Sequence, residues 1–415
     1  MIVQEKPALS TARVLFITIA LTAMIATTFG FGRYLFRVVL PEMRADIGFN
    51  YATAGVLNAL LSSGYLLFAF IIPGFTKRIG ATRIILLATL LAVAALFWMA
   101  SATAVWVVGL MLFLLGISSA GSWVPMVAVV SRFAPREHQV KILGLITSGV
   151  NYGIFVSGLL APWALTNGSW RLLWTVTAVI SLLILVISIG VMWPSGLLQR
   201  SVQAAVQQDQ AKQERGISVW QRLRGIKRPF VILILMHTFG GLYGPTYGAY
   251  LSAYIRDELG LSVALNGQVW SIIGIGGMVS GLAMGWLGDR IGTRRTLQLT
   301  YLCGIIAALL ALDHRFPAMF LLAAVFIAFG FIPMYGQVAG YIAKATSADE
   351  GTFIFAVANV THGVAGLLAA YFGGVWQNAT GTFFWIYLVV LASAVIALLL
   401  TFWLVEETAV VVERS

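Results

Sequence analysis

Acidic residues are scarce in this sequence, and their scarcity excludes most soluble proteins. Only 15 of the 415 residues are Asp or Glu, and charged residues of both signs make up 10% of the chain, against about 25% in a typical soluble domain. Apolar residues account for 60%. Lipid is therefore the main solvent. The 26 Lys and Arg give a net charge of +11, which we interpret through membrane topology rather than as a nucleic-acid-binding surface.

Cysteine and the motifs of catalysis are almost absent too. A lone cysteine, Cys303, excludes an intramolecular disulfide and lies in an apolar run, where we expect a buried small hydrophobic side chain. No Walker sequence, nucleophile elbow or cluster of metal-ligating residues occurs. Gly274-Ile275-Gly276-Gly277 lies inside an apolar stretch with no strand before it. We therefore predict a protein that is not an enzyme and holds no cofactor or metal.

Long apolar stretches dominate the sequence instead. A bilayer core about 30 Å thick needs roughly 20 apolar residues in a helix, and twelve such stretches alternate with short charged connections. They cover residues 14–40, 52–72, 83–101, 104–131, 139–161, 171–193, 229–255, 266–287, 296–312, 317–342, 352–374 and 381–405. The sequence predicts an all-α membrane protein with twelve transmembrane helices, the first of them a retained helix rather than a signal peptide.

Basic residues are distributed unevenly between the two sides of these spans. If the N-terminus is cytoplasmic, twenty Lys and Arg lie in the inner segments, whereas the outer loops hold Arg44, Arg171, Arg256 and Arg315. This asymmetry satisfies the positive-inside rule with an even number of spans. We predict that both termini are cytoplasmic. The two remaining arginines, Arg33 and Arg37, lie within the first span.

A polar segment divides the chain into two related halves. Residues 196–228 are rich in Gln, Lys and Arg and predict a cytoplasmic linker between two six-helix bundles, residues 1–195 and 229–415. The halves carry a faint repeat, in which Thr28-Phe29-Gly30 recurs as Thr238-Phe239-Gly240 and four such matches occur in order at offsets of 208 to 212 residues. Duplicated six-helix halves are typical of secondary transporters.

One segment after the eighth predicted span resembles a known family. The residues from Gly285 to Arg295, GWLGDRIGTRR, are similar to the cytoplasmic loop motif of the major facilitator superfamily. The resemblance implies the fold of that family and a monomer in a bacterial inner membrane. It also implies that Asp289 and Arg290 hold and release an inward-closed state. The first-half copy departs from the motif, because Lys77 replaces the acidic residue.

Arg33 carries the main functional prediction. No Asp or Glu lies in any predicted span, so fixed positive charge in a cavity there would attract anions, and a guanidinium can hold a carboxylate with two hydrogen bonds. Arg33 lies fifteen residues before Gly48, an arrangement similar to the first helix of the family's anion:cation symporter branch. That branch has an acidic residue where this chain has Gly32, so its proton coupling does not carry over.

Two alternatives remain for Arg33, namely snorkelling to the outer interface and a structural pairing with helix carbonyls. For Arg37, one helical turn nearer the surface, we expect snorkelling. Two histidines deep in predicted spans, His362 and His237, could titrate near neutral pH and couple transport to protons. A buried neutral histidine bonded to a backbone carbonyl is the alternative for each. His362 is also a candidate for substrate binding.

Aromatic and polar residues complete the set of candidates. Tyr243, Tyr247, Tyr250 and Tyr254 share one helical face, and we predict the first two in the substrate cavity and the last two in the outer aromatic belt. The other candidates for cavity lining are polar or aromatic, with bonding between helices as the alternative: Trp123, Asn151, Tyr152, Tyr335, Gln337 and Asn359.

These observations predict a secondary active transporter for a small organic anion, first of all a carboxylate. Protons or a counter-anion are the expected coupling partners, the lipid bilayer surrounds the protein, and no nucleic acid is expected. The aromatic candidates leave open an efflux pump for hydrophobic compounds, which would tolerate replacement of Arg33. A transporter-like membrane sensor is a rival from another class, although the linker contains no recognisable signalling domain.

Overall fold

A computed structural model describes residues 10–198, 219–313 and 316–406. These residues form helices and no strand, and twelve helical segments are long and apolar enough to cross a membrane. The prediction of an all-α protein with twelve transmembrane helices is confirmed. Residues 199–218 of the predicted linker lie outside the described residues, and the short helix α12 (Val219–Arg224) follows them.

The first half contains six membrane-length segments. The first segment combines α1 (Thr11–Ile25), the π-helix η1 (Ala26–Tyr34) and α2 (Leu35–Val38). The short helix α3 (Leu40–Ile47) comes next. The other segments are α4 (Tyr51–Ile79), α5 (Ala81–Ala100), α6 (Val105–Trp123) with α7 (Met126–Phe133), α8 (Gln139–Thr147) with α9 (Gly149–Asn167), and α10 (Trp170–Met192).

The second half repeats this plan. Its first segment is α13 (Arg228–Ala249), which is followed by two short pieces, α14 (Leu251–Ala253) and the π-helix η4 (Tyr254–Glu258). The other segments are α15 (Val263–Ile291), α16 (Thr293–Leu312), α17 (Ala318–Phe331) with α18 (Met334–Ala345), α19 (Ala348–Thr380) and α20 (Phe384–Thr401).

Glycines with left-handed backbone mark the same helix ends in both halves. Gly48 and Gly260 have φ values of 79° and 63°, and Gly80 and Gly292 have φ values of 101° and 89°. Each pair is separated by 212 residues in the sequence. Glycine adopts this conformation without the steric penalty that a Cβ atom would add. The internal repeat of the sequence is therefore also a repeat of backbone conformation.

The two halves meet along two helix pairs, α4 with α19 and α9 with α15. Both contacts depend on glycine. A Cβ atom on Gly55 of α4 would lie 2.7 Å from the carbonyl oxygen of Tyr371, and one on Gly158 of α9 would lie 2.5 Å from the backbone nitrogen of Ser271. Close approach of backbones through small residues is the usual way in which membrane helices associate.

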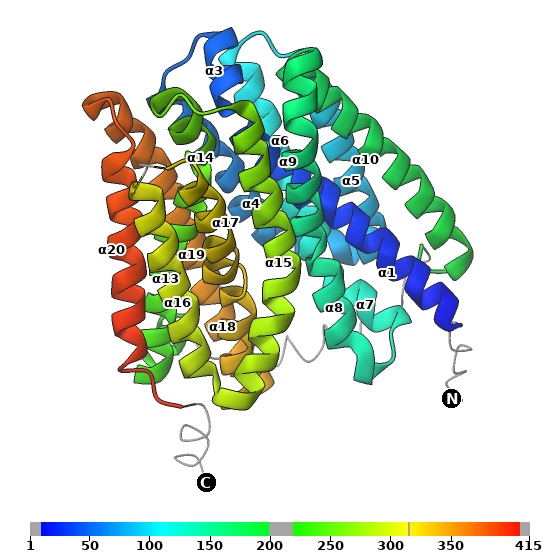
Figure 1. Cartoon of the computed structure of the whole chain (residues 1–415). Helices are drawn as coiled ribbons and strands as arrows, with labels where there is room; N and C mark the ends of the chain where they lie inside the picture. The colour runs from blue at the N-terminus through cyan, green and yellow to red at the C-terminus, as the bar shows by residue number, and fades with distance from the viewer. Residues whose placement is uncertain (1–9, 199–218, 314–315, 407–415) are drawn as a thin grey trace, which may run out of the picture.

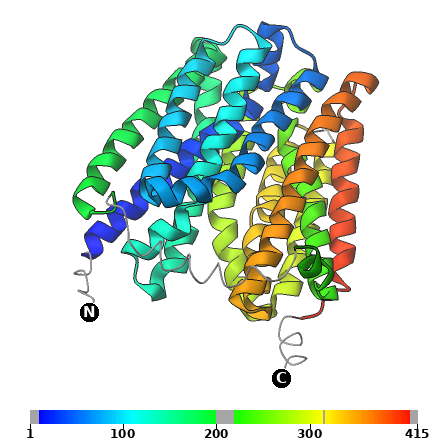
Figure 2. The ribbon, with the colours of Figure 1, turned by 180° about the vertical axis from the view of Figure 1, so that it is seen from behind.

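Ion pairs join the halves at the end of the bundle that carries α3. Arg44 of α3 contacts Asp257 of η4 at 3.2 Å, and Arg256 of η4 contacts Glu42 of α3 at 3.5 Å. Figures 1 and 2 show the ribbons of the halves converging at this end and diverging at the opposite end, where α1 begins and α20 ends. If the termini are cytoplasmic as predicted, this arrangement is closed to the outside and faces inward.

Several expectations about the helices need correction. Tyr250 and Tyr254 are buried in the core beside Phe383 rather than placed in an outer aromatic belt, because α14 and η4 turn inward between the halves. Asp289 and Arg290 form the last turn of α15 rather than a loop, since this helix is longer than its apolar stretch. Cys303 is half-buried rather than buried.

Candidate functional site

The π-helix in the first span positions Arg33. The Arg33 guanidinium lies over the rings of Phe29 and Tyr65, at 5.6 and 5.0 Å from their centroids. The helix passes very close to α9 here, since a Cβ atom on Gly30 would lie 2.5 Å from Cα of Gly153. π-helical turns inside α-helices occur frequently at functional sites. Arg33 is thus held half-buried by aromatic faces, with no acidic partner among the residues that the structure describes.

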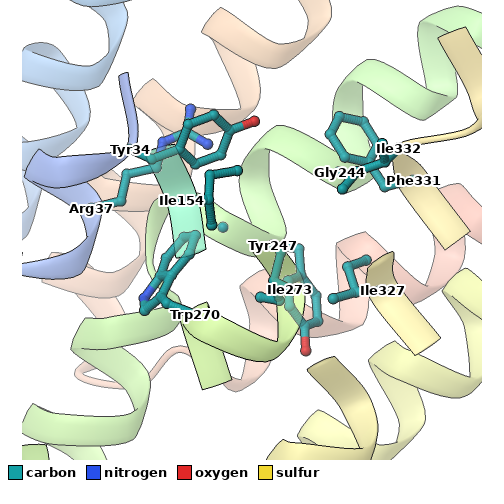
Figure 3. Close-up of a pocket in the computed structure, with 11 residues that line it drawn as sticks. Tyr34, Arg37, Ile154, Gly244, Tyr247, Trp270, Ile273, Ile327, Phe331 and Ile332 are labelled. Atoms are coloured by element: carbon teal, nitrogen blue, oxygen red, sulfur yellow. The ribbon is translucent and has the colours of Figure 1, made fainter. Parts of the chain in front are cut away.

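Arg37, one turn further along, is buried rather than snorkelled. Its side chain is only 7% exposed, and its guanidinium lies 5.0 Å from the ring of Tyr34. The expected snorkelling fails because α3 and α14 meet over this part of the first span and close its path to the outer surface. Arg37 instead lines a cavity between the halves (Figure 3).

The positive charge of these two arginines is not neutralised within the described part of the chain. Neither Arg33 nor Arg37 takes part in any ion pair recorded among the described residues. The Nε atom of Arg37 is buried and has no hydrogen-bond partner there. A buried charge without a partner is costly.

The cavity beside Arg37 is small and mostly apolar. Its volume is about 30 Å³, room for roughly two water molecules. Figure 3 shows Tyr34 and Arg37 on one wall and Phe331 and Ile332 on the opposite wall, so both halves contribute. The remaining lining residues are Ile154, Gly244, Tyr247, Gly248, Trp270, Ile273 and Ile327.

His362 lies at the centre of a hydrogen-bonded group near Arg33. Its Nδ1 atom is 2.9 Å from the carbonyl oxygen of His237, and its Nε2 atom is 2.8 Å from the hydroxyl of Tyr335. The two imidazole rings are stacked with centroids 4.4 Å apart. Arg33 lies within electrostatic range of both His362 and Tyr335. The structure therefore brings two predicted site residues from different helices, Tyr335 of α18 and His362 of α19, into hydrogen-bond contact.

Other predicted site residues are engaged in bonds inside the second half. Tyr243 donates a hydrogen bond to the carbonyl of Gly330, the amide of Gln337 pairs with the hydroxyl of Thr300 at 2.9 and 3.0 Å, and Asn359 donates to the carbonyl of Phe355. Tyr247 does reach the cavity, but only with its ring, since its hydroxyl points away from the Arg37 guanidinium (Figure 3).

Three predicted residues of the first half have different surroundings. Asn151 is buried where α9 crosses α15, with its amide against Gly277. Tyr152 is exposed. Trp123 contacts the edge of Phe29 at a centroid distance of 6.2 Å and so supports one of the rings that hold Arg33. Of these three, Trp123 is therefore nearest to the arginine site.

The predicted cytoplasmic gate shows contacts within the second half. Asp289 accepts a hydrogen bond of 3.3 Å from Lys344, and the guanidinium of Arg290 lies 3.8 Å from the Trp286 ring centroid. Asp289 is largely exposed. A role for Asp289 and Arg290 in holding the inward-closed state stays a prediction.

The ion pairs between α3 and η4 were missed by reasoning from the sequence. Arg44 and Arg256 are 212 residues apart, the offset of the repeat, and this equivalence was the available signal. Burial raises the pKa of the Glu42 carboxyl above its usual value, and Arg256 opposes the rise only in part. Tyr34 and Tyr65 were missed as well, and nothing in the sequence distinguishes them from the many other aromatic residues.

Comparison with known proteins places this architecture among transporters. The model of the Major Facilitator Superfamily matches residues 22–370. The cis,cis-muconate transport protein of Acinetobacter baylyi is 21% identical over 325 residues, which is 77% of this chain and 78% of that protein.

Two solved structures share the fold. A D-xylose–proton symporter has a TM-score of 0.74 at 15% identity, covering 96% of this chain and 99% of its own. The nucleoside transporter NupG in its D323A form has a TM-score of 0.73 at 12% identity, covering 94% and 99%.

Proposed function

Because this chain belongs to the major facilitator superfamily and is a multi-pass membrane transporter rather than an enzyme, we propose that its substrate is a small organic anion, most simply a carboxylate. The anion binds between the two halves at Arg33 and Arg37. The halves then rock about this site, so that it opens to one side of the membrane at a time. The expected location is a bacterial inner membrane.

The observation that carries this proposal is the pair of arginines without acidic partners. Both lie on the first span, and Arg37 is buried, with only 7% of its surface exposed. Their positive charges oppose each other and are paired with no carboxylate among the described residues. An anion between the halves would remove this cost, whereas a cation would add to it. The charge of the site thus favours an anionic guest.

The spacing of the two arginines favours a substrate with two anionic groups. Four residues along a helix correspond to a rise of about 6 Å, and each guanidinium can hold one carboxylate by two parallel hydrogen bonds. The muconate carrier among the relatives takes a compound with two carboxylates. The aromatic rings of Tyr34, Tyr65 and Phe29 suit a flat or unsaturated carbon skeleton between the acid groups.

The outer contacts fit the cycle of such a carrier. The Arg44–Asp257 and Glu42–Arg256 pairs join the halves at the end that carries α3. With cytoplasmic termini this end faces outward, and the pairs must then separate when the site opens to the outside. Asp289 and Arg290 would act at the opposite side, in the inward-closed state. The cavity of about 30 Å³ would widen as the halves move.

Hydrophobic efflux is the second candidate, because the cavity walls are largely apolar and aromatic. The two candidates differ in how they depend on Arg33 and Arg37. An efflux site for lipophilic compounds would bind without either guanidinium. An anion site would lose most of its affinity when either is removed.

The test is ligand-induced thermal stabilisation of the purified protein. The probes are a carboxylate panel of benzoate, succinate and cis,cis-muconate, with a sulfonate, a phosphate and a lipophilic cation for comparison. We expect stabilisation by at least one carboxylate, its loss in Arg33→Ala and Arg37→Ala, and its retention in Arg13→Ala, an exposed arginine near the start of the same span. Stabilisation by the cation that persists in the Arg33 and Arg37 variants would refute the proposal and favour efflux.

A further inference from the structure

We propose that Tyr335 and His362 couple proton binding to anion binding, with His362 as the proton carrier. When a proton from water binds to Nε2 of His362, the hydrogen bond to Tyr335 reverses. The hydroxyl of Tyr335 is then free to donate to the anion held by Arg33. This inference rests on the proposed anion site and adds to it a reason why a proton should travel with the anion.

The hydrogen bonds of His362 determine where its proton lies. A carbonyl oxygen can only accept, so Nδ1 of His362 must donate to the carbonyl of His237, 2.9 Å away. In the neutral ring, Nε2 then has a lone pair and accepts from the Tyr335 hydroxyl, 2.8 Å away. The resting state therefore has the Tyr335 proton directed toward His362.

Protonation changes this geometry at a single atom. Nε2 becomes a donor, so the oxygen of Tyr335 must accept from it, and the hydroxyl hydrogen has to rotate to another acceptor. Tyr335 lies within electrostatic range of Arg33, Arg37, Tyr34 and Tyr65, which offer no anionic acceptor of their own. A carboxylate bound to Arg33 would supply one. No covalent bond changes, and the proton remains on His362 until it returns to water.

The charges around His362 link the two events. The titratable and charged groups that face it are Arg33 from the first span, His237 from α13 and Tyr335 from α18, and none of these is a carboxylate. Without an anion, the charge of Arg33 opposes a second positive charge on His362. A bound anion neutralises Arg33 and removes that opposition. By thermodynamic reciprocity, protonated His362 strengthens anion binding by the same factor.

The two predicted coupling histidines therefore take different roles. Tyr335 is 37% exposed, whereas His362, to which it is hydrogen-bonded, is 6% exposed. The ring nitrogens of His237 are both buried without a hydrogen-bond partner among the described residues. His237 acts through its backbone carbonyl, which fixes the tautomer of His362. It is a positioning residue, and His362 is the one that titrates.

Proton uptake on anion binding tests this directly. Isothermal titration of the wild-type protein with benzoate, succinate or muconate, in buffers of different ionisation enthalpy, gives the number of protons bound with each anion. Near neutral pH we expect each bound anion to bring up to about one proton with it. The anion should bind roughly tenfold more tightly at pH 5.5 than at pH 8, within the usual range of such couplings. His362→Gln and Tyr335→Phe should still bind the anion, with a change below about threefold over the same range. His138→Gln, an exposed histidine at the α7–α8 connection, should behave as wild type.

The possible failures point to different conclusions. Anion binding by the wild type without proton uptake at any pH from 5.5 to 8 would overturn the coupling inference and leave the anion site standing. Unchanged proton uptake in a folded His362→Gln variant would overturn it as well. If none of the three carboxylates binds at any pH, the proposed function itself fails. The measurement on the wild type decides the matter even if a variant does not fold.

Discussion

The ion pair between Arg44 and Asp257 should hold the two halves together at the end of the bundle that carries α3, which is the outer end if the termini are cytoplasmic as predicted. The pair is 3.2 Å long and about one quarter to one third exposed, and Asp257 also accepts a hydrogen bond from the hydroxyl of Tyr51. Asp257→Asn removes the charge while keeping the shape. An exposed ion pair contributes up to about 1 kcal/mol and a hydrogen bond to a charged group about 1.5 to 3 kcal/mol, of which the amide retains part.

A loss of about 1 to 2 kcal/mol changes a two-state population by roughly 5- to 30-fold. We therefore expect Asp257→Asn to shift the protein toward the outward-open state by this factor. Spin labels on Ser101→Cys and Ala379→Cys, exposed positions beyond α5 and in the last turn of α19, report the outer separation in a Cys303→Ser background. A longer distance should appear in the pulsed-resonance distribution. Glu137→Gln, an exposed acid at the opposite end, serves as the control.

An unchanged distance distribution in Asp257→Asn would refute this reasoning. It would mean that helix contacts such as α4 with α19 determine the closure alone. A shift in Glu137→Gln of the same size would also contradict it, because loss of any acid would then have the same effect. Loss of ordered distances altogether would indicate unfolding, which circular dichroism distinguishes from opening.

Three further predictions follow from single contacts. Burial raises the pKa of Glu42 where α3 meets η4, so protonation of Glu42 favours the arrangement in which the halves are closed at this end. The fraction of closed protein should rise as the pH falls through that pKa. Glu42→Gln should abolish this pH dependence of the distance between the two spin labels. Gly30→Ala would place Cβ 2.5 Å from Gly153 Cα and should cost about 1 to 3 kcal/mol, seen as a lower Tm, whereas Gly190→Ala, with open space around it, should not lower it. A hydrogen bond from Arg171 lowers the pKa of Asp46 in the folded protein. The ionised Asp46 carboxylate therefore stabilises the fold at pH values above its unfolded pKa, and this contribution is lost as the pH falls. Asp46→Asn should lower the free energy of unfolding by less than about 1 kcal/mol at pH 7 and should have no effect near pH 2.

The fold could be predicted from the sequence because lipid imposes simple rules on it. Each span has to satisfy its backbone internally over the bilayer thickness, so helix number follows from apolar length. The repeat was visible in matching tripeptides, and the structure repeats with it, since Gly80 and Gly292 end α4 and α15 alike with a positive φ. Helix ends were less predictable, because α15 and α19 continue beyond their apolar stretches.

The site was only partly predictable, for reasons of conformation. Arg33 could be singled out as a charge in an apolar span. The burial of Arg37 could not be foreseen, because it depends on α3 and α14 closing over it rather than on its depth in the helix. The contact between Tyr335 and His362 joins α18 to α19, and no spacing in the sequence encodes it. Helical periodicity predicted Tyr243 in the cavity beside Tyr247, but Tyr243 is not among the residues that line it, and its hydroxyl is bonded to Gly330 inside the second half.

The central claim is that Arg33 and Arg37 form an anion site that serves transport, and uptake into proteoliposomes tests it most directly. Radiolabelled succinate, benzoate and muconate would be offered to vesicles containing wild type, Arg33→Ala, Arg37→Ala or Arg13→Ala. The account predicts uptake of at least one carboxylate by wild type and Arg13→Ala and a loss of more than about tenfold, or 1.4 kcal/mol of binding, in the other two. Equal uptake by all four proteins, or transport of a lipophilic cation in place of any carboxylate, would contradict it.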